Sequence, residues 1–316
     1  MTVAFSCLVH FPAAHGRQEI NVRRLISFEI ESGFKMLTGI AEIKFPRNMR
    51  NFDKLKVNDI FQKGDPVVIS AGYNGDEYDE FNGYVLQVST GFPVVIKCED
   101  EMYNLKRKTI SISKRNCTLK ELLSEIASGY TIQCDDSPLG SVRYSMKLVS
   151  EILDDLKSKM GLYTYFRCKT LVSGRTSIDG GKHVKINLDL QASETLKEKS
   201  IEKVYVRLES LQRNGKMLKY SKGEKNSNGI IIKQPNLTLV EIKQIVETTY
   251  TNAMKPGLDG EITLWGIPRL EHGMIADLYS NIYPEKNGAY YIDSVKKTVS
   301  PTGGYRQVAK LGNKTS

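Results

Sequence analysis

The chain has 316 residues, of which 40% are hydrophobic and 26% charged, as in a globular protein long enough for two or three domains. No apolar run approaches the ~20 residues that cross a bilayer, so the sequence predicts no membrane segment. The net charge of +9 permits contact with nucleic acid or an acidic surface without demanding it.

Residues 1–105 have the pattern of short strands. Residues 27–31 and 40–45 alternate between polar and apolar side chains, as half-buried strands do. Pro46 should end the second of these strands, because proline has no amide hydrogen for a β ladder. The dipeptide Asn74-Gly75 accepts positive φ and favours a hairpin turn. Several short strands separated by turns indicate a barrel or small sandwich.

The pattern changes to helix near residue 116. Thr118 and Glu121 form a capping box, and the helix that follows should bury Leu119, Leu122, Leu123 and Ile126. Apolar residues at helical spacing predict a second helix from about residue 145 to Met160, followed by a strand at 162–166. Residues 106–183 therefore read as a small α/β insert.

β character returns after residue 184. Residues 201–208 and 217–220 flank Asn214-Gly215, another hairpin signal. The polar, basic stretch 219–228 is expected to be a mobile hairpin tip or a loop. Thr238 and Glu241 form a second capping box. It opens a helix to about residue 253, with five side chains expected inward: Leu239, Ile242, Ile245, Val246 and Thr249.

Two stretches of the chain repeat one order of features: a glycine, a strand, a polar turn, an Asn-Gly pair opening an aromatic strand, and a further strand. In the first stretch the glycine, the Asn-Gly pair and the last strand are Gly64, Asn82-Gly83 and 93–98; in the second they are Gly273, Asn287-Gly288 and 305–311. A repeated β unit without a catalytic motif favours a scaffold over an enzyme.

A search for chemistry finds no constellation of specific spacing. The sequence contains no nucleophile elbow and no phosphate-binding glycine loop. Its four histidines and five cysteines are scattered, which argues against a metal centre or a disulfide framework. Adjacent carboxylates such as Asp135-Asp136 point to opposite faces of a strand and do not pair for acid–base catalysis. We therefore predict no catalytic, cofactor-binding or metal-binding residues and no cofactor.

The C-terminal third carries a resemblance to a known family. The relevant residues are 258–268 (Leu-Asp-Gly-Glu-Ile-Thr-Leu-Trp-Gly-Ile-Pro), 271–274 (Glu-His-Gly-Met), 287–292 (Asn-Gly-Ala-Tyr-Tyr-Ile), 303–307 and 311–312, with 37–48, 81–85 and 160–166 upstream. They resemble the baseplate hub proteins of tailed phages, the late-control-protein-D family, which is similar to the hub part of type VI secretion spike proteins. The chain departs from the family pattern where Met274 follows Gly273, since hub relatives often have Gly-Asp there.

This resemblance implies a mainly β fold in which two similar β-barrels, residues 1–105 and 184–316, flank the α/β insert 106–183. We expect residues 20–105 and 184–316 to superpose. The family's role implies a homotrimeric baseplate hub ring, a virion structural component that adapts a six-fold tail tube to a three-fold spike or tip. It also implies assembly in the bacterial host cytoplasm, contact with tube or distal tail proteins, and DNA passing through without specific binding. No spike, lysozyme or peptidase segment is expected.

Two alternatives remain open. A nucleic-acid-binding β-barrel would use the basic loops 106–108, 114–115 and 213–225, and its affinity would fall with salt. A tail-associated hydrolase would need residues such as Asp135 or His272, and only scattered carboxylates and histidines favour it.

Overall fold

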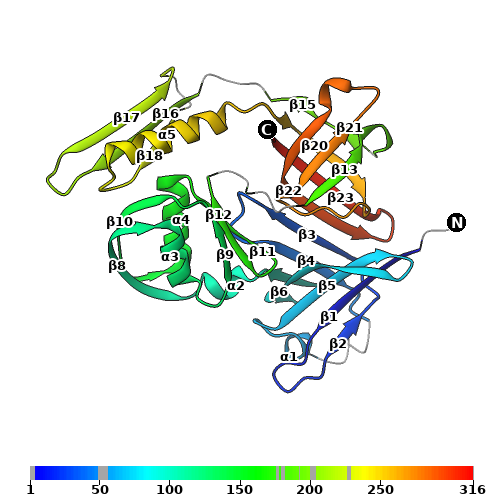
Figure 1. Cartoon of the computed structure of the whole chain (residues 1–316). Helices are drawn as coiled ribbons and strands as arrows, with labels where there is room; N and C mark the ends of the chain where they lie inside the picture. Colours follow the sequence, from blue (N-terminus) through cyan, green and yellow to red (C-terminus); the bar gives the residue numbers. More distant parts are fainter. Residues whose placement is uncertain are drawn as a thin grey trace.

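The computed structural model describes residues 4–48, 56–175, 178, 182–191, 193–199, 204–225 and 229–315. Thirteen strands from both ends of the chain join in one sheet, and two smaller units with helices lie beside it (Figure 1). The predicted fold class, mainly β with an α/β insert, is confirmed.

The first half of the chain supplies seven strands of the large sheet. They are β1 (Phe5–Phe11), β2 (Ile20–Val22), β3 (Ser27–Gly33), β4 (Ile40–Phe45), β5 (Pro66–Tyr73), β6 (Asp76–Ser89) and β7 (Val94–Glu99), with α1 (Val57–Ile60) before β5 and α2 (Met102–Leu105) after β7. β4 ends before Pro46, and Asn74 and Gly75 form the hairpin turn with φ of 55° and 92°, as predicted.

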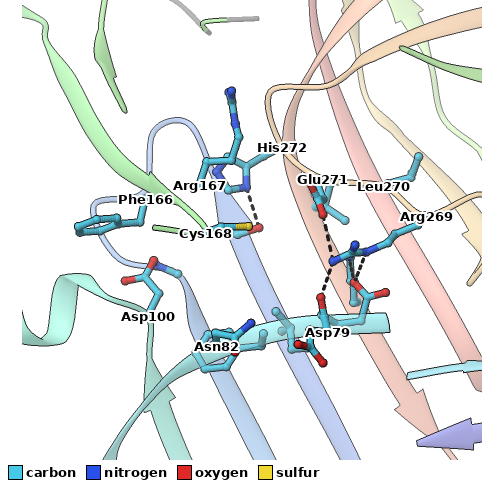
Figure 2. Close-up of a pocket in the computed structure, with 17 residues that line it drawn as sticks. Asp79, Asn82, Asp100, Phe166, Arg167, Cys168, Arg269, Leu270, Glu271 and His272 are labelled. Carbon is cyan, nitrogen blue, oxygen red and sulfur yellow. Dashed lines mark hydrogen bonds and ion pairs between the residues drawn. The ribbon is translucent and has the colours of Figure 1, made fainter. Parts of the chain in front are cut away.

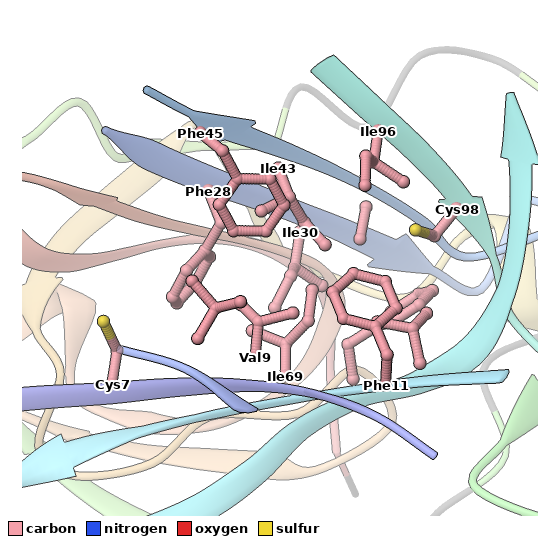
Figure 3. Close-up of a cluster of buried hydrophobic side chains, with 14 of the residues drawn as sticks. Cys7, Val9, Phe11, Phe28, Ile30, Ile43, Phe45, Ile69, Ile96 and Cys98 are labelled. Atoms are coloured by element: carbon pink, nitrogen blue, oxygen red, sulfur yellow. The ribbon is translucent and has the colours of Figure 1, made fainter. Parts of the chain in front are cut away.

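These strands bend around one apolar core (Figure 3). Alternate side chains point into it because successive residues of a strand face opposite sides. Three aromatic rings meet at its centre: Phe11 lies with its centroid 4.6 Å from that of Phe61, and Phe45 stacks on Phe61 at 6.3 Å. Phe61 follows α1 directly, so this short helix fixes the ring's position.

The insert forms two small sheets around α3 and α4. Its elements are β8 (Thr109–Thr118), α3 (Leu119–Ile126), β9 (Thr131–Cys134), β10 (Pro138–Leu148), α4 (Val149–Met160), β11 (Tyr163–Arg167) and β12 (Thr170–Gly174). The Thr118 capping box and the four inward side chains of α3 are confirmed. α4 begins later than the predicted residue 145, because residues up to Leu148 continue β10 and pair with β8.

The second half supplies the rest of the large sheet. Its elements are β13 (His183–Asn187), η1 (Leu188–Leu190), β14 (Ser193–Glu194), β15 (Lys197–Glu198), β19 (Leu258–Asp259), β20 (Glu261–Trp265), β21 (Ile275–Tyr279), η2 (Pro284–Lys286), β22 (Gly288–Ser300) and β23 (Gly304–Lys314). β15 and β19 pair only with each other, and the other strands join the large sheet. A second apolar core lies beneath them.

Between β15 and β19 the chain forms a unit with its own sheet and its own core. β16 (Tyr205–Leu211), β17 (Met217–Gly223) and β18 (Ile230–Lys233) pair with one another and pack on α5 (Leu239–Ala253). The second half of the chain thus holds this unit as well as its part of the large sheet. In Figure 1 this unit lies beside the insert. Asn236 Nδ2 donates a hydrogen bond to Ser141 Oγ of the insert at 2.6 Å.

Two details of this unit differ from the sequence-based expectation. Residues 219–223 belong to β17, so the predicted loop is a strand up to Gly223, and residues 226–228 lie outside the described part of the chain. The Thr238 capping box is confirmed, but Leu239 is 46% exposed. It occupies the first helical position, whereas the contact with the sheet is made from Ile242 onward.

The glycine of the repeat predicted from the sequence makes matching hydrogen bonds in the two stretches. Gly64 (φ 94°) donates its N–H to Val85 O at 2.8 Å, and Gly273 (φ 81°) donates to Ile292 O at the same distance. In each copy the acceptor residue donates back to the residue after the glycine, at 2.8 and 2.9 Å. We call residues 64–98 the first copy and residues 273–311 the second copy.

Strand pairing extends this match. Four consecutive pairs correspond: Pro66–Tyr84, Val67–Gly83, Val68–Asn82 and Ile69–Phe81 in the first copy, and Ile275–Tyr291, Ala276–Tyr290, Asp277–Ala289 and Leu278–Gly288 in the second. A register shift follows Val85 in one copy and Ile292 in the other. The copies differ at their flanking strand, since β1 runs antiparallel to β5 but β13 runs parallel to β21. The predicted correspondence of the two Asn-Gly pairs is wrong, because Gly83 corresponds in register to Tyr290 and Gly288 to Phe81. The match is therefore local to the three-strand unit.

No helix among the described residues is long and apolar enough to cross a membrane.

The aromatic centre of the first core gives a test of the fold. Phe61→Ala should lower the free energy of unfolding by about 3–5 kcal/mol, because it removes a fully buried ring and leaves a cavity. Val240→Ala, at a side chain that is 74% exposed, is the control and should change it by less than about 0.5 kcal/mol. Denaturant unfolding measures both, and equal effects would contradict this core.

Candidate functional site: a continuous sheet and its buried charged seam

β22 is the strand that joins the two halves of the molecule. Its first residues pair with β21 of the second half, and residues 294–299 pair with β3 of the first half. Asp293 lies at the changeover, where its carbonyl accepts the N–H of Phe34 at 2.8 Å. The order β14-β20-β23-β22-β3-β4-β7-β6 is thus one uninterrupted hydrogen-bonded sheet.

The face of this sheet that points away from the two cores is polar and mixed in charge. Its charged side chains are Glu29, Glu31, Glu42, Lys44, Lys97, Glu261, Lys296, Arg306 and Lys310. Cross-strand and neighbouring pairs neutralise many of them: Lys296–Glu29 at 2.7 Å, Lys44–Glu42 at 3.0 Å and Lys310–Glu261 at 3.3 Å. Arg306 stacks over the ring of Trp265 at 3.2 Å. We call this surface the outer face.

A β-bulge turns one acidic side chain inward beneath the sheet. Ile69 pairs with Phe81 but Ser70 pairs with Asp79, so Glu80 is the extra residue in β6. Bulges re-aim side chains in this way. The Glu80 side chain is 1% exposed and forms ion pairs with Lys297 and, at 3.2 Å, with Arg269 Nε.

The partners of Glu80 extend this pair into a chain of alternating charges. Lys297 lies on the inward side of β22 between two apolar positions, and its side chain is 6% exposed. Arg269 Nη2 also contacts Glu271 Oε1 at 3.0 Å and donates to the carbonyl of Asp79. We call Glu80, Arg269, Glu271 and Lys297 the charged seam. It ties β6 of the first half to β22 and the loop before β21.

Gln307, a buried residue of β23, fixes the position of the loop before β21 by side-chain hydrogen bonds. Its Nε2 donates to the carbonyls of Trp265 and Pro268 at 2.9 and 2.8 Å, and its Oε1 accepts the N–H of Leu270 at 2.9 Å. The Gln307 side chain is fully buried, with its amide satisfied on both sides. Such a bonded side chain sets the path of the loop because every alternative leaves a buried polar group unpaired.

His272 is a further buried titratable group at this junction. Its Nδ1 lies 2.9 Å from Ser32 Oγ of β3. Burial, and next the Arg167 guanidinium, lower the pKa of His272 to about 4. The imidazole is therefore neutral at physiological pH.

A cavity of about 100 Å³ lies where the two halves meet the insert (Figure 2). Cys168, Asp100 and His272 all line it. Asp100 accepts the N–H groups of Gly39 and Met102 at 2.7 and 3.0 Å, and burial raises its pKa to about 7. Its oxygens are thus bound within the fold, as is His272 Nδ1, and the cavity is small for a substrate.

The residues named in the two alternatives belong to different elements and have different partners. Lys106 Nζ pairs with Glu99 at 2.6 Å and Arg107 with the same carboxylate at 3.7 Å, so the 106–108 cluster is partly neutralised. Asp135 lies beside Arg175 in the insert, whereas His272 lies against Ser32 of β3. Among the described residues no cluster of three or more His, Cys, Asp or Glu side chains could hold a metal ion.

No family model matches the chain, and no curated protein matches it in sequence. Solved structures do match it. A tail protein from Neisseria meningitidis MC58 aligns with a TM-score of 0.68 at 11% identity, over 98% of this chain and 96% of that one. The 43 kDa tail protein of prophage MuSo2 from Shewanella oneidensis aligns with a TM-score of 0.62 at 11% identity, over 98% and 97%.

A third match is an E. coli component of the type VI secretion system whose structure is similar to the T4 bacteriophage tail proteins gp27 and gp5. It aligns with a TM-score of 0.57 at 10% identity, over 92% of this chain and 74% of that one. The chain therefore has the fold of phage tail and type VI secretion proteins, as the sequence resemblance predicted.

The charged seam predicts strong coupling between its members. Glu80→Gln alone should lower the free energy of unfolding by about 3–5 kcal/mol, because it leaves the buried Lys297 ammonium without its carboxylate. Lys297→Met alone should also destabilise, whereas the double variant should cost less than the sum of the two single changes. A double-mutant cycle in denaturant measures this, and additive effects would contradict the pairing.

His272 predicts a pH dependence of stability. Its folded pKa lies below the ordinary value of 6.5, so between pH 6.5 and about 4 the unfolded chain binds a proton that the folded chain excludes. The free energy of unfolding should fall across this window as pH falls, by up to about 3 kcal/mol, and be unaffected by this group above it. His272→Gln should remove that component, and an unchanged slope in the variant would contradict the assignment.

Proposed function

We propose that the chain is a non-enzymatic structural component of a phage tail or phage-like injection device, where three copies form a baseplate hub ring. The observation that carries the proposal is the repeat of one three-strand unit, with matching register, at both ends of a single continuous sheet. Three chains would then present six similar units. Such a ring can meet a six-fold tube on one side and a three-fold spike or tip on the other.

The ends of the sheet suit a head-to-tail ring. β2 and β14 are the end strands, and each is very short. β2 covers only residues 9–11 of β1, and β14 covers only residues 262–263 of β20. On the same side, residues 5–8 of β1 and 264–265 of β20 have no partner strand within the described residues. Unpaired edges invite pairing with another chain, and head-to-tail contacts close into a ring when the rotation permits.

The outer face suits the wall of a water-filled channel. Its charges are mixed and mutually paired, so it lacks the strong positive field that holds nucleic acid. DNA could pass such a wall without specific binding. Within this proposal, residues 1–105 and 184–316 are the two ring-forming domains and residues 106–183 the peripheral insert, with residues 204–254 a further peripheral unit.

The partners of this proposal are the chain itself, tail tube or distal tail proteins, and a spike or tip protein. Its place is the virion tail, assembled in the host cytoplasm. The fold similarity to tail proteins and to a type VI secretion component favours these partners.

The mass of the purified protein tests the proposal. Light scattering should give three times the 35.6 kDa of one chain, and negative-stain images should show rings. A protein that stays monomeric alone and with tube or spike proteins would overturn the proposal.

A further inference from the structure

β17 is a long strand with a free edge. It is an end strand of the sheet β17-β16-β18 and pairs with β16 along all seven of its residues, without a register shift. No strand of the described residues pairs with its other side, which lies at the outer margin of the molecule in Figure 1. β2 and β14, the end strands of the large sheet, have only three and two residues. β17 therefore presents a longer free edge than either.

The hydrogen bonds of the β16–β17 hairpin show which backbone groups of β17 point outward. The N–H of Gln212 donates to the carbonyl of Lys216 at 2.8 Å. Hydrogen-bonded and non-hydrogen-bonded pairs alternate along antiparallel strands. The carbonyl of Glu209, the partner of Lys219, accordingly accepts the N–H of Gln234 on the side away from β17, at 3.1 Å. Every second residue of β17 therefore directs its N–H and C=O to the free edge, and these residues are Met217, Lys219, Ser221 and Gly223.

The face of this sheet opposite α5 carries an excess of positive charge. Alternate residues of β16 pack on α5, so those between them point to the opposite face. Arg207 of β16, Lys219 of β17 and Lys233 of β18 lie on that face by their register. Glu209 is the only acidic residue of the three strands. It pairs with Arg207 and lies 3.7 Å from Lys219 Nζ, so one carboxylate faces three cations.

β17 is held in place from the α5 side. The Tyr220 hydroxyl donates to Glu247 of α5 at 2.9 Å, and Lys222 forms an ion pair with the same carboxylate. The sheet also has its own apolar core with α5. The side chains that fix the strand thus alternate with the residues whose backbone groups face the free edge. A preformed edge loses little conformational entropy when another segment binds to it.

We propose that the free edge of β17 binds an extended acidic segment of another protein, which adds a fourth strand to this sheet. The backbone of that segment pairs with Lys219 and Ser221, and its carboxylates lie on the face opposite α5. A second copy of β17 would instead bring further lysines to this face, and like charges on paired strands repel. Nucleic acid would meet the cations but has no amide backbone to continue the ladder. The inference is independent of the proposed ring.

Binding of a defined peptide to the full chain tests this edge. The probe is a fluorescein-labelled peptide of alternating glutamate and valine with blocked ends, followed by fluorescence anisotropy. Its control is the same peptide with N-methyl groups on alternate amides, which keeps the charge and removes the donors of one edge. The unmodified peptide should bind about tenfold more tightly, because only it can complete the ladder. Equal binding of the two peptides would overturn strand addition, and so would no binding of either.

Substitutions in the chain give a second readout. Lys219→Glu should weaken binding of the acidic peptide about fivefold, because it reverses the charge beside the bound segment. Ser221→Pro should weaken it as well, since it removes an outward N–H without taking a hydrogen bond from β16. Lys243→Glu, the same charge change at an exposed residue of α5, is the matched control and should leave binding nearly unchanged. Equal binding by the Lys219→Glu and Lys243→Glu variants, with both folded by circular dichroism, would overturn the site.

Amide hydrogen exchange locates the bound peptide and separates the other occupants. The peptide should slow exchange in residues 217–223 and leave residues 109–118 of the insert unchanged. Single-stranded DNA that binds more tightly than the peptide, and is weakened by Lys219→Glu but not by Ser221→Pro, would assign the surface to nucleic acid and overturn the proposal. Loss of self-association in the Ser221→Pro variant would assign the edge to a second copy of the chain and would overturn it as well.

Discussion

The arrangement of the two halves depends on the buried ion pair between Glu80 and Lys297. Each charge would be costly alone in the interior, where an unpaired ion has lost its hydration. The pair is therefore useful chiefly because it excludes other arrangements. If β22 shifted by one residue against β3, Lys297 would leave the interior, and Glu80 would lose its main partner. The burial of Lys297 against Glu80 and the backbone pairing of β22 with β3 together join the two copies into one sheet. These copies lie far apart in the sequence.

The local parts of the fold could be predicted from the sequence, since each depends on neighbouring residues. The capping boxes at Thr118 and Thr238 satisfy helix amides within four residues of the chain. The turn at Asn74-Gly75 depends on residues that accept positive φ. Gly64 and Gly273 could be recognised in the sequence for the same reason, and their matching hydrogen bonds confirm that part of the repeat. The similarity of two whole barrels stays a prediction.

The parts that could not be predicted depend on contacts distant in sequence. Lys297 is a charged residue at an inward position of an alternating strand, which indicates a buried partner. That partner, Glu80, lies 217 residues away in the sequence and could not be identified from it. The bulge that aims Glu80 inward leaves no pattern in the residues around it. The start of α4 was placed too early because residues 145–148 have helical spacing but are held in β10 by pairing with β8. The separate core of residues 204–254 could not be predicted either, because it is formed by the packing of α5 on β16, β17 and β18.

A reconstruction of the purified assembly by electron cryo-microscopy tests the central claim most directly. The account predicts a closed three-fold ring in which first and second copies alternate, whereas a monomer, an open filament or a ring with the two copies on different radii would contradict it.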